Sequence, residues 1–330
     1  MGKSIVICMP VREKKLIEQI RRLSRGNRYL ATGIGDDCAV LRVPPGHEML
    51  VTTDFSLEGV HFRRDWHSPE IVGWRCLTRG LSDIAAMGGE PRAAFLSLAV
   101  DGDTSQKWVN RFLKGLLELA AQFEIPLAGG DLAQSASGIQ ADIVAVGSVP
   151  RGNAVLRSGA KAGQQIYVTG QLGGAAAALA RLRNSTSLGA ECSRFLRPQA
   201  RVAVGEWLRR RGMVSAMIDL SDGLSTDLEH ICHQSGVGAQ IEEQMIPRAA
   251  LGKKRVALEL ALHGGDDYEL LFTSGASVPK VIAGVPISRI GRTTRSGGMQ
   301  LIRLNGKRVR LEAEGWEHFS RFGTSRDSTH

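Results

Sequence analysis

Apolar residues recur at helical spacing in several stretches of the chain. In residues 11–24, Leu16, Ile17, Ile20 and Leu23 fall on one face of a helix. Residues 68–87 form a second such stretch, with Ser68 in the N-cap position and Pro69 at the first helical position. The same spacing predicts helices over 106–123, 173–182, 198–212 and 225–235.

Short apolar runs between these helices predict strands. They cover 39–43, 49–53, 93–100, 125–128, 139–149, 165–169, 216–220, 268–273, 287–290, 299–304 and 308–311. Because strands and helices are mixed along the whole chain, the pattern predicts an α/β or α+β fold.

A break in composition divides the chain near its middle. Pro150, Gly152 and Asn153 interrupt the periodic segments, and 330 residues suit two domains of ordinary size. We therefore expect one domain over residues 1–150 and a second over 151–330.

Composition and charge narrow the function classes. The hydrophobic share of 43% and the charged share of 23% are those of a globular protein. Aromatic residues make up 5%, which disfavours an aromatic-rich single-strand binder. The net charge of +9 allows a nucleic-acid partner or small anionic substrates. The basic residues are dispersed, so solvated surfaces are favoured over a nucleic-acid stripe.

Cysteine usage and apolar runs bear on location. The chain has five cysteines and no Cys-x-x-Cys pair, which predicts a reducing, cytoplasmic setting and no cysteine-based zinc site. Since no apolar run reaches bilayer length, we expect no membrane partner. The short apolar start of the chain lacks a cleavage site and is not read as a signal peptide.

Several common catalytic motifs are absent. Gly-Lys-Ser at residues 2–4 lacks the upstream glycine of a P-loop, and the glycines at 33 and 35 do not complete a dinucleotide fingerprint. No His-x-x-x-His pair is present, which disfavours a zinc hydrolase. The glycine-rich turn at 170–174 has two interpretations, a phosphate-binding loop and, more favoured, a plain strand-to-helix turn.

Acidic residues stand beside Gly, Ser or Thr at the ends of six apolar segments. They are Asp36 and Asp37, Asp54, Asp83, Asp131, Asp219 and Asp222, and Asp266 and Asp267. A single such element is usually a turn. Six of them in a basic protein indicate carboxylates that need cations, and Mg²⁺ sites commonly share ligands with substrate phosphates. The residues therefore predict a Mg²⁺-dependent, phosphate-handling enzyme without a P-loop.

These segments resemble the motifs of the thiamine-monophosphate kinases, in the superfamily of aminoimidazole ribonucleotide synthetase and selenophosphate synthetase. The resemblance runs from about residue 11 to 320, and the glycine–aspartate elements are shared by the superfamily. The segments that point to the kinases are Glu58-Gly59-Val60-His61-Phe62 and Asp267-Tyr268-Glu269-Leu270-Leu271.

The resemblance implies a two-domain fold and ATP-dependent phosphorylation of thiamine monophosphate to thiamine diphosphate. It implies that domain 1–150 binds ATP and Mg²⁺ and pairs in a homodimer through a β-barrel-like sheet. Domain 151–330 would complete the active site. We expect transfer to be direct and in line, without a phosphorylated enzyme.

The resemblance also implies the site residues. Several Mg²⁺ ions would be held by Asp36, Thr52, Thr53, Asp54, Asp83, Asp131, Asp219 and Asp222, of which Asp83, Asp219 and Asp222 are expected to be catalytic. ATP would be contacted by Gly130, Asp131, Arg157 and Ser221, and the acceptor by His61, Glu269 and Trp316.

Some of these residues have structural alternatives. His61 also suits a turn, and Trp316 a place in the core, with Phe319 as another contact for the acceptor. Glu269 lies in an apolar strand, where a lone charge is costly, so function is favoured. Leu113 stands where the family often has a tyrosine near the adenine, and Leu113→Tyr is expected to tighten ATP binding.

Other functions compete with the kinase. The closest alternative is another ATP-using synthetase of the superfamily. A selenophosphate synthetase needs a reactive cysteine near the N-terminus, and Cys8 has only apolar neighbours. A nucleic-acid-binding function would leave the acidic segments unexplained. An inactive scaffold would not need them, so both alternatives are disfavoured.

Overall fold

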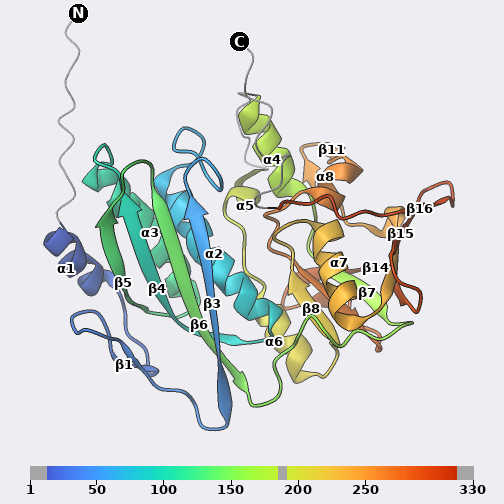
Figure 1. The fold of residues 1–330 in the computed structure, drawn as a ribbon, viewed down its shortest axis with the longest axis horizontal. Coiled ribbons are helices and arrows are strands. Elements are labelled where there is room, and N and C mark those ends of the chain that lie inside the picture. The colour runs from blue at the N-terminus through green and yellow to red at the C-terminus, as the bar shows by residue number, and fades with distance from the viewer. Residues whose placement is uncertain (1–12, 185–191, 318–330) are drawn as a thin grey trace, which may run out of the picture. The chain divides into compact units, whose positions relative to one another are not determined.

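The computed structural model describes residues 13–184 and 192–317, and the chain forms two compact units (Figure 1). The first unit contains residues up to Ala154 together with Leu196–Val202. The second contains Val155–Phe195 and the residues from Ala203 onward. Each unit is described by itself below.

A four-stranded sheet forms the body of the first unit. Its strand order is β3-β6-β4-β5, with only β4 and β5 parallel. The sheet is open, since β3 and β5 are its edges. The strands are β3 (His47–Leu57), β4 (Glu90–Val100), β5 (Leu127–Gln134) and β6 (Gln140–Pro150).

Two helices, α2 (Pro69–Ala86) and α3 (Gln106–Gln122), pack against each other in this unit, and α2 lies on the sheet (Figure 1). Glycines let their backbones approach closely. A Cβ at Gly73 would lie 2.0 Å from the carbonyl oxygen of Phe112, and one at Gly115 would lie 1.9 Å from that of Glu70. Any side chain at either position would push the helices apart.

The N-terminal part of the first unit is made of short elements. They are α1 (Glu13–Leu23), β1 (Leu30–Thr32) and β2 (Val40–Leu41), and β1 pairs with β2. Leu16 and Ile20 of α1 are buried, as the helical spacing predicts, whereas Ile17 and Leu23, expected on the same face, are exposed.

An eight-stranded sheet forms the second unit. The main path runs β16-β15-β9-β14-β7-β12-β8, β13 pairs with β14, and only β9 and β15 are parallel. Its strands are β7 (Gln165–Thr169), β8 (Ala216–Asp219), β9 (Gly238–Glu242), β12 (Leu270–Ser274), β13 (Val281–Ile282), β14 (Val285–Thr294), β15 (Met299–Ile302) and β16 (Arg308–Arg310).

Helices of the second unit supply the rest of its core. Leu228 and Ile231 of α7 (Leu224–Ser235) join Ile218 of β8 and Leu271 of β12 in one buried cluster. The remaining elements are α4 (Gly174–Arg183), α5 (Ser193–Leu196), α6 (Val202–Arg210), η2 (Glu243–Met245), β10 (Ala250–Leu251), β11 (Lys254–Arg255) and α8 (Leu258–His263).

Most predicted elements are present, with shifted ends. The helix expected over 68–87 begins at Pro69, but Ser68 makes no side-chain hydrogen bond as its cap. The helix expected over 198–212 starts only at Val202, because residues 196–202 belong to the packing of the first unit. Strand β9 and helix α8 were not predicted, and neither were the short elements β1, α5, η2, β10, β11 and β13. Among the described residues, no helix is long and apolar enough to cross a membrane.

Candidate functional site

In the first unit, β3 and α2 bring three of the predicted metal ligands together. Thr52 and Asp54 alternate along β3 and face α2, because successive strand residues point to opposite sides. The hydroxyl of Thr52 donates a hydrogen bond to the carboxylate of Asp83 on α2. One turn earlier on α2, Arg79 donates to Asp54 over 3.4 Å. The hydroxyl and the two carboxylates form a set of hard oxygen donors of the kind that Mg²⁺ selects.

The other predicted ligands of this unit lie elsewhere on it. Thr53 points to the face of β3 opposite to Thr52. Gly130 and Asp131 lie on β5, which is separated from β3 by two strands. Asp36 is exposed and its Oδ1 accepts from the backbone N–H of Asp37. In this unit, then, a hydrogen bond joins Thr52 to Asp83, and an ion pair joins Asp54 to Arg79.

His61 follows β3 and is half-buried. Its Nδ1 accepts a hydrogen bond from the backbone N–H of Leu57 over 3.0 Å. An Nδ1 that accepts cannot carry the proton of a neutral imidazole, so Nε2 carries it and is a donor.

In the second unit, the residues after β8 lie against the residues before β12. Leu270 of β12 pairs with Asp219 of β8, and the backbone N–H of Leu220 donates to the carbonyl of Glu269 over 2.8 Å. The N–H of Asp266 donates to the carbonyl of Ser221, also over 2.8 Å. Two acidic motifs about 45 residues apart in the chain are thereby joined into one structure.

This junction contains strained backbone. Asp266 has a φ of 66° and Tyr268 a φ of 51°, in the left-handed region that residues other than glycine seldom adopt. The Tyr268 hydroxyl donates to Asp266 Oδ1 over 2.6 Å, which helps hold that conformation. Such strain is concentrated at functional sites.

Three carboxylates gather at the start of α7. Asp219 is 3% exposed and Asp227 only 1%. Oδ2 of Asp227 accepts from the backbone N–H groups of Asp222 and Gly223 over 3.2 and 3.1 Å. Burial raises the pKa of Asp227 well above its usual value, and the charges of Asp219 and Asp222 raise it further. Ligand atoms of Asp222, Asp227 and His230 lie within 4.8 Å of one another.

Sequence reasoning missed Asp227. The signal was available: an aspartate on the same helical face as Leu224, Leu228 and Ile231 is a buried charge, which requires a specific partner. The donor set of the cluster fits a hard cation, since carboxylates that repel one another are neutralised by a metal ion.

The remaining predicted residues of the second unit differ in exposure. Arg157 is exposed. Trp316 is 46% exposed, and its backbone N–H donates to the carbonyl of Asp222 over 3.0 Å, so it lies beside the carboxylate cluster. Glu269 is 2% exposed. His318 and Phe319 lie outside the described residues, and so does Cys8.

The glycine-rich turn at 170–174 precedes α4, whose N-terminus is occupied by a side chain of the same unit. The carboxylate of Asp267 accepts from the backbone N–H groups of Gly173 and Ala175 over 2.6 and 3.3 Å. These are the donors that a phosphate-binding loop would offer. The turn is therefore a strand-to-helix connection held by Asp267.

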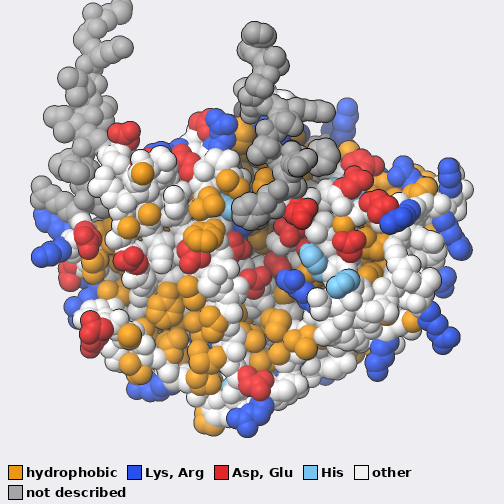
Figure 2. Space-filling view, in the orientation of Figure 1, with side chains coloured by type: hydrophobic (Ala, Val, Ile, Leu, Met, Phe, Trp, Pro, Cys, Tyr) orange, Lys and Arg blue, Asp and Glu red, His pale blue; other side chains and the backbone are white. Residues whose placement is uncertain are grey.

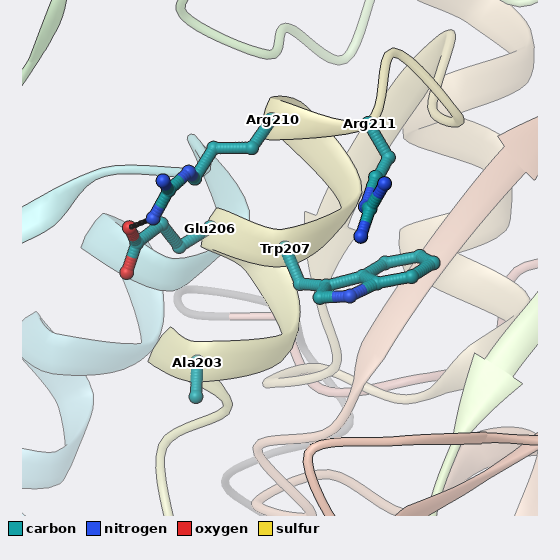
Figure 3. Close-up of a pocket in the computed structure, with 5 residues that line it drawn as sticks. All are labelled: Ala203, Glu206, Trp207, Arg210 and Arg211. Atoms are coloured by element: carbon teal, nitrogen blue, oxygen red, sulfur yellow. Dashed lines mark hydrogen bonds and ion pairs between the residues drawn. The ribbon is translucent and has the colours of Figure 1, made fainter.

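Two surface hollows are lined by other residues. One of about 480 Å³ is lined by residues of α6 and by Arg211, which follows this helix (Figure 3). There Arg210 pairs with Glu206 at 3.1 Å, and Arg211 lies over the ring of Trp207. The other, of about 340 Å³, is lined by residues 64–69, Trp108 and Arg111. Neither contains a predicted site residue.

Known proteins are similar in sequence to this chain over most of its length. The N-terminal domain model of AIR synthase related proteins matches residues 35–149, and the C-terminal domain model matches residues 161–302. The thiamine-monophosphate kinase of Salmonella typhimurium is 37% identical, over 88% of this chain and 92% of its own. The chain belongs to the thiamine-monophosphate kinase family. The family member from Bacillus subtilis is 32% identical, over 93% of this chain and 99% of its own.

Solved structures of the family have the same fold. The thiamine-monophosphate kinase of Stenotrophomonas maltophilia has a TM-score of 0.76 at 33% identity and covers 91% of this chain and 98% of its own. AaThiL complexed with AMPPCP and TMP has a TM-score of 0.73 at 30% identity, covering 95% and 100%. The hydrogenase maturation protein HypE, at 16% identity and a TM-score of 0.73, shares the fold alone. The two-domain α/β architecture with mixed sheets is thus that of the AIR synthase related proteins.

Proposed function

We propose that this protein phosphorylates thiamine monophosphate to thiamine diphosphate with ATP as co-substrate. The observation that carries the proposal is its 37% identity to a thiamine-monophosphate kinase over 92% of that enzyme. The complex of AaThiL with AMPPCP and TMP, related at 30% identity over the full length of that chain, supports the same substrates.

We assign the Mg²⁺ ligands to both units. In the first they are Asp36, Thr52, Thr53, Asp54, Asp83 and Asp131, and in the second Asp219 and Asp222. The oxygen donors joined around Thr52 and the carboxylates around Asp227 support the assignment. Bound Mg²⁺ neutralises the charge of phosphate oxygens, which otherwise repel an attacking phosphate.

The nucleotide is assigned to Gly130, Asp131, Arg157 and Ser221. An exposed guanidinium such as that of Arg157 can donate two parallel hydrogen bonds to a phosphate.

The acceptor is assigned to His61, Glu269 and Trp316. His61 offers the Nε2 proton as a donor, and Glu269 offers a negative charge to the cationic thiazolium ring. The half-exposed indole of Trp316 can stack on a cationic ring.

The phosphoryl group passes directly from ATP to the acceptor phosphate. Asp83, Asp219 and Asp222 are the residues on which turnover depends most, and each acts as a ligand and not as a nucleophile. An enzyme nucleophile would need an adjacent group that activates it. The hydroxyl of Thr52 and the N–H groups around Asp227 instead hold carboxylates in fixed orientations.

We propose that the protein is a homodimer paired through the outer face of the first unit's sheet. Met49, Val51 and Phe55 of β3 point away from α2 and are 45%, 62% and 56% exposed. Figure 2 shows apolar side chains gathered on the surface of the first unit. An apolar row of this kind on an edge strand is usually covered by a partner. Phe55→Glu should convert dimers to monomers in sedimentation equilibrium, and a monomeric wild type would contradict the pairing.

Incubation with ATP, Mg²⁺ and thiamine monophosphate, followed by separation of the thiamine phosphates, tests the function. We expect thiamine diphosphate to form, and free thiamine in place of the acceptor to give no product. Incubation with γ-labelled ATP and no acceptor should leave the denatured protein unlabelled. A labelled, chase-competent protein would exclude direct transfer. The described cysteines are free thiols, which suits a cytoplasmic enzyme.

A further inference from the structure

Glu269 places a carboxyl group in one of the least exposed parts of the second unit. Its residue is 2% exposed, and the three residues that follow it, Leu270, Leu271 and Phe272, are 0% exposed. A carboxylate removed from water in this way is costly unless hydrogen bonds hold it. The groups that hold it therefore also decide where it points.

Thr169, the last residue of β7, makes such a hydrogen bond. It is 0% exposed, and its Oγ1 donates to Oε2 of Glu269 over 2.5 Å. The same Oγ1 accepts from the backbone N–H of Leu270 over 2.8 Å. A hydroxyl has one proton, so with the peptide N–H donating to it, that proton goes to the carboxylate. The direction of the hydrogen bond is fixed by the backbone.

The next residue leaves space for the carboxylate. A Cβ at Gly170, where φ is +59°, would lie 2.0 Å from Oε1 of Glu269 and 2.3 Å from its Cδ. No real side chain tolerates contacts that short. Thr169 and Gly170 thus act on the same group, one by a hydrogen bond and the other by having no side chain.

We propose that Thr169 is a positioning residue that fixes the Glu269 carboxylate for recognition of the cationic part of the acceptor. This rests on the proposed function, in which Glu269 contacts thiamine monophosphate. Without the hydroxyl, the carboxylate loses the hydrogen bond that sets the direction of Oε2, and its alignment with a cationic ring is weakened. The nucleotide is assigned to other residues, so the effect is specific to the acceptor.

Thr169→Val removes the hydroxyl and keeps the shape of the side chain. We expect KM for thiamine monophosphate to rise about tenfold, the size of one hydrogen bond to a charged group, while KM for ATP changes less than about twofold. Thr169→Ser restores the hydroxyl and should restore the KM. If the valine variant does not fold, Thr169→Ala tests the same loss.

Thr273 provides a matched control. It is also 0% exposed and lies in β12, the strand that pairs with β7, but its Oγ1 has no hydrogen-bond partner in the structure. Thr273→Val should leave both KM values unchanged. A double-mutant cycle adds a second readout: once Glu269→Gln is present, Thr169→Val should have little further effect on KM for the acceptor.

The outcomes separate the two proposals. If the wild type does not phosphorylate thiamine monophosphate, both are overturned. If the wild type is active and Thr169→Val raises the two KM values equally, or raises neither, the positioning role alone is overturned. The same holds if Thr169→Ser does not rescue the valine variant, because a role in packing would then explain the loss.

Discussion

Asp267 gives the structure a distinctive dependence of stability on pH. Its carboxylate lies at the N-terminus of α4 and accepts two backbone N–H groups. Burial raises the pKa of Asp267 to about 7 from an ordinary value near 3.8, and the two hydrogen bonds lower it by less than burial raises it. The charges of Glu269 and Asp266 add to the rise.

The sign follows from the protons bound in each state. Between about pH 4 and pH 7 the unfolded chain releases the proton of Asp267 while the folded protein keeps it, so the folded state binds more protons. The free energy of unfolding therefore falls as the pH rises through this window. Below it both states are protonated and the group contributes nothing. A pKa raised from 3.8 to about 7 corresponds to about 4 kcal/mol lost in total.

Asp267→Asn removes the titration and keeps the size of the side chain. We would measure urea unfolding of the wild type and this variant from pH 4 to pH 8, without Mg²⁺ or nucleotide. The free energy of unfolding of the variant minus that of the wild type should rise by about 4 kcal/mol from pH 4 to pH 8. All other groups titrate in both proteins, so their contributions cancel in this difference. Asp37→Asn, at an exposed position, controls for the loss of one charge.

A difference that stays flat from pH 4 to pH 8 would refute this reasoning. If the wild type instead gains stability over the variant as the pH rises, the N–H groups of Gly173 and Ala175 outweigh burial, and the pKa of Asp267 is lowered.

Three other expectations concern packing and turnover. Gly115→Ala places a Cβ 1.9 Å from the carbonyl oxygen of Glu70 and should lower the free energy of unfolding by about 1–3 kcal/mol, measured in urea; an unchanged value would contradict the close crossing. The sequence-based expectation for Leu113 is revised, because this side chain is 0% exposed: Leu113→Tyr should lower the thermal midpoint without tightening ATP binding, as calorimetric titration can check. Asp83→Asn should lower kcat at least about a hundredfold, with partial recovery at raised Mg²⁺; full activity would show that Asp83 only shapes the fold.

Elements were predicted well from the sequence where a clear local signal, such as a glycine turn, marks the end of an apolar run. β7 occupies the predicted residues because it is an apolar run that ends at a glycine turn. β9 was missed because it is short and includes Gln240, and its place between β14 and β15 is decided by partners distant in the chain. The late start of α6 has the same kind of cause, since Pro198 is engaged by Trp74 of the first unit.

The sequence also named residues of the candidate site, but not how they meet. Thr52 and Asp83 belong to separate motifs, and only the packing of α2 on β3 joins them. Residues that act through another, such as Thr169 and Asp227, belong to no recognisable motif. Their importance lies in burial and in hydrogen bonds that the fold creates.

The segment Leu196–Val202 has a consequence for how the chain is made. It belongs to the first unit, where the indole N–H of buried Trp74 donates to the carbonyl of Pro198 over 2.8 Å. A ribosome completes β6, then β7 and α4 of the second unit, and only afterwards this segment. During synthesis, the first unit therefore lacks the carbonyl of Pro198 as the partner of the Trp74 indole N–H until part of the second unit has already emerged. Trp74 fluorescence in stalled nascent chains should change only once Val202 has left the exit tunnel, and a chain that stops at Ala154 should yield a less stable unit.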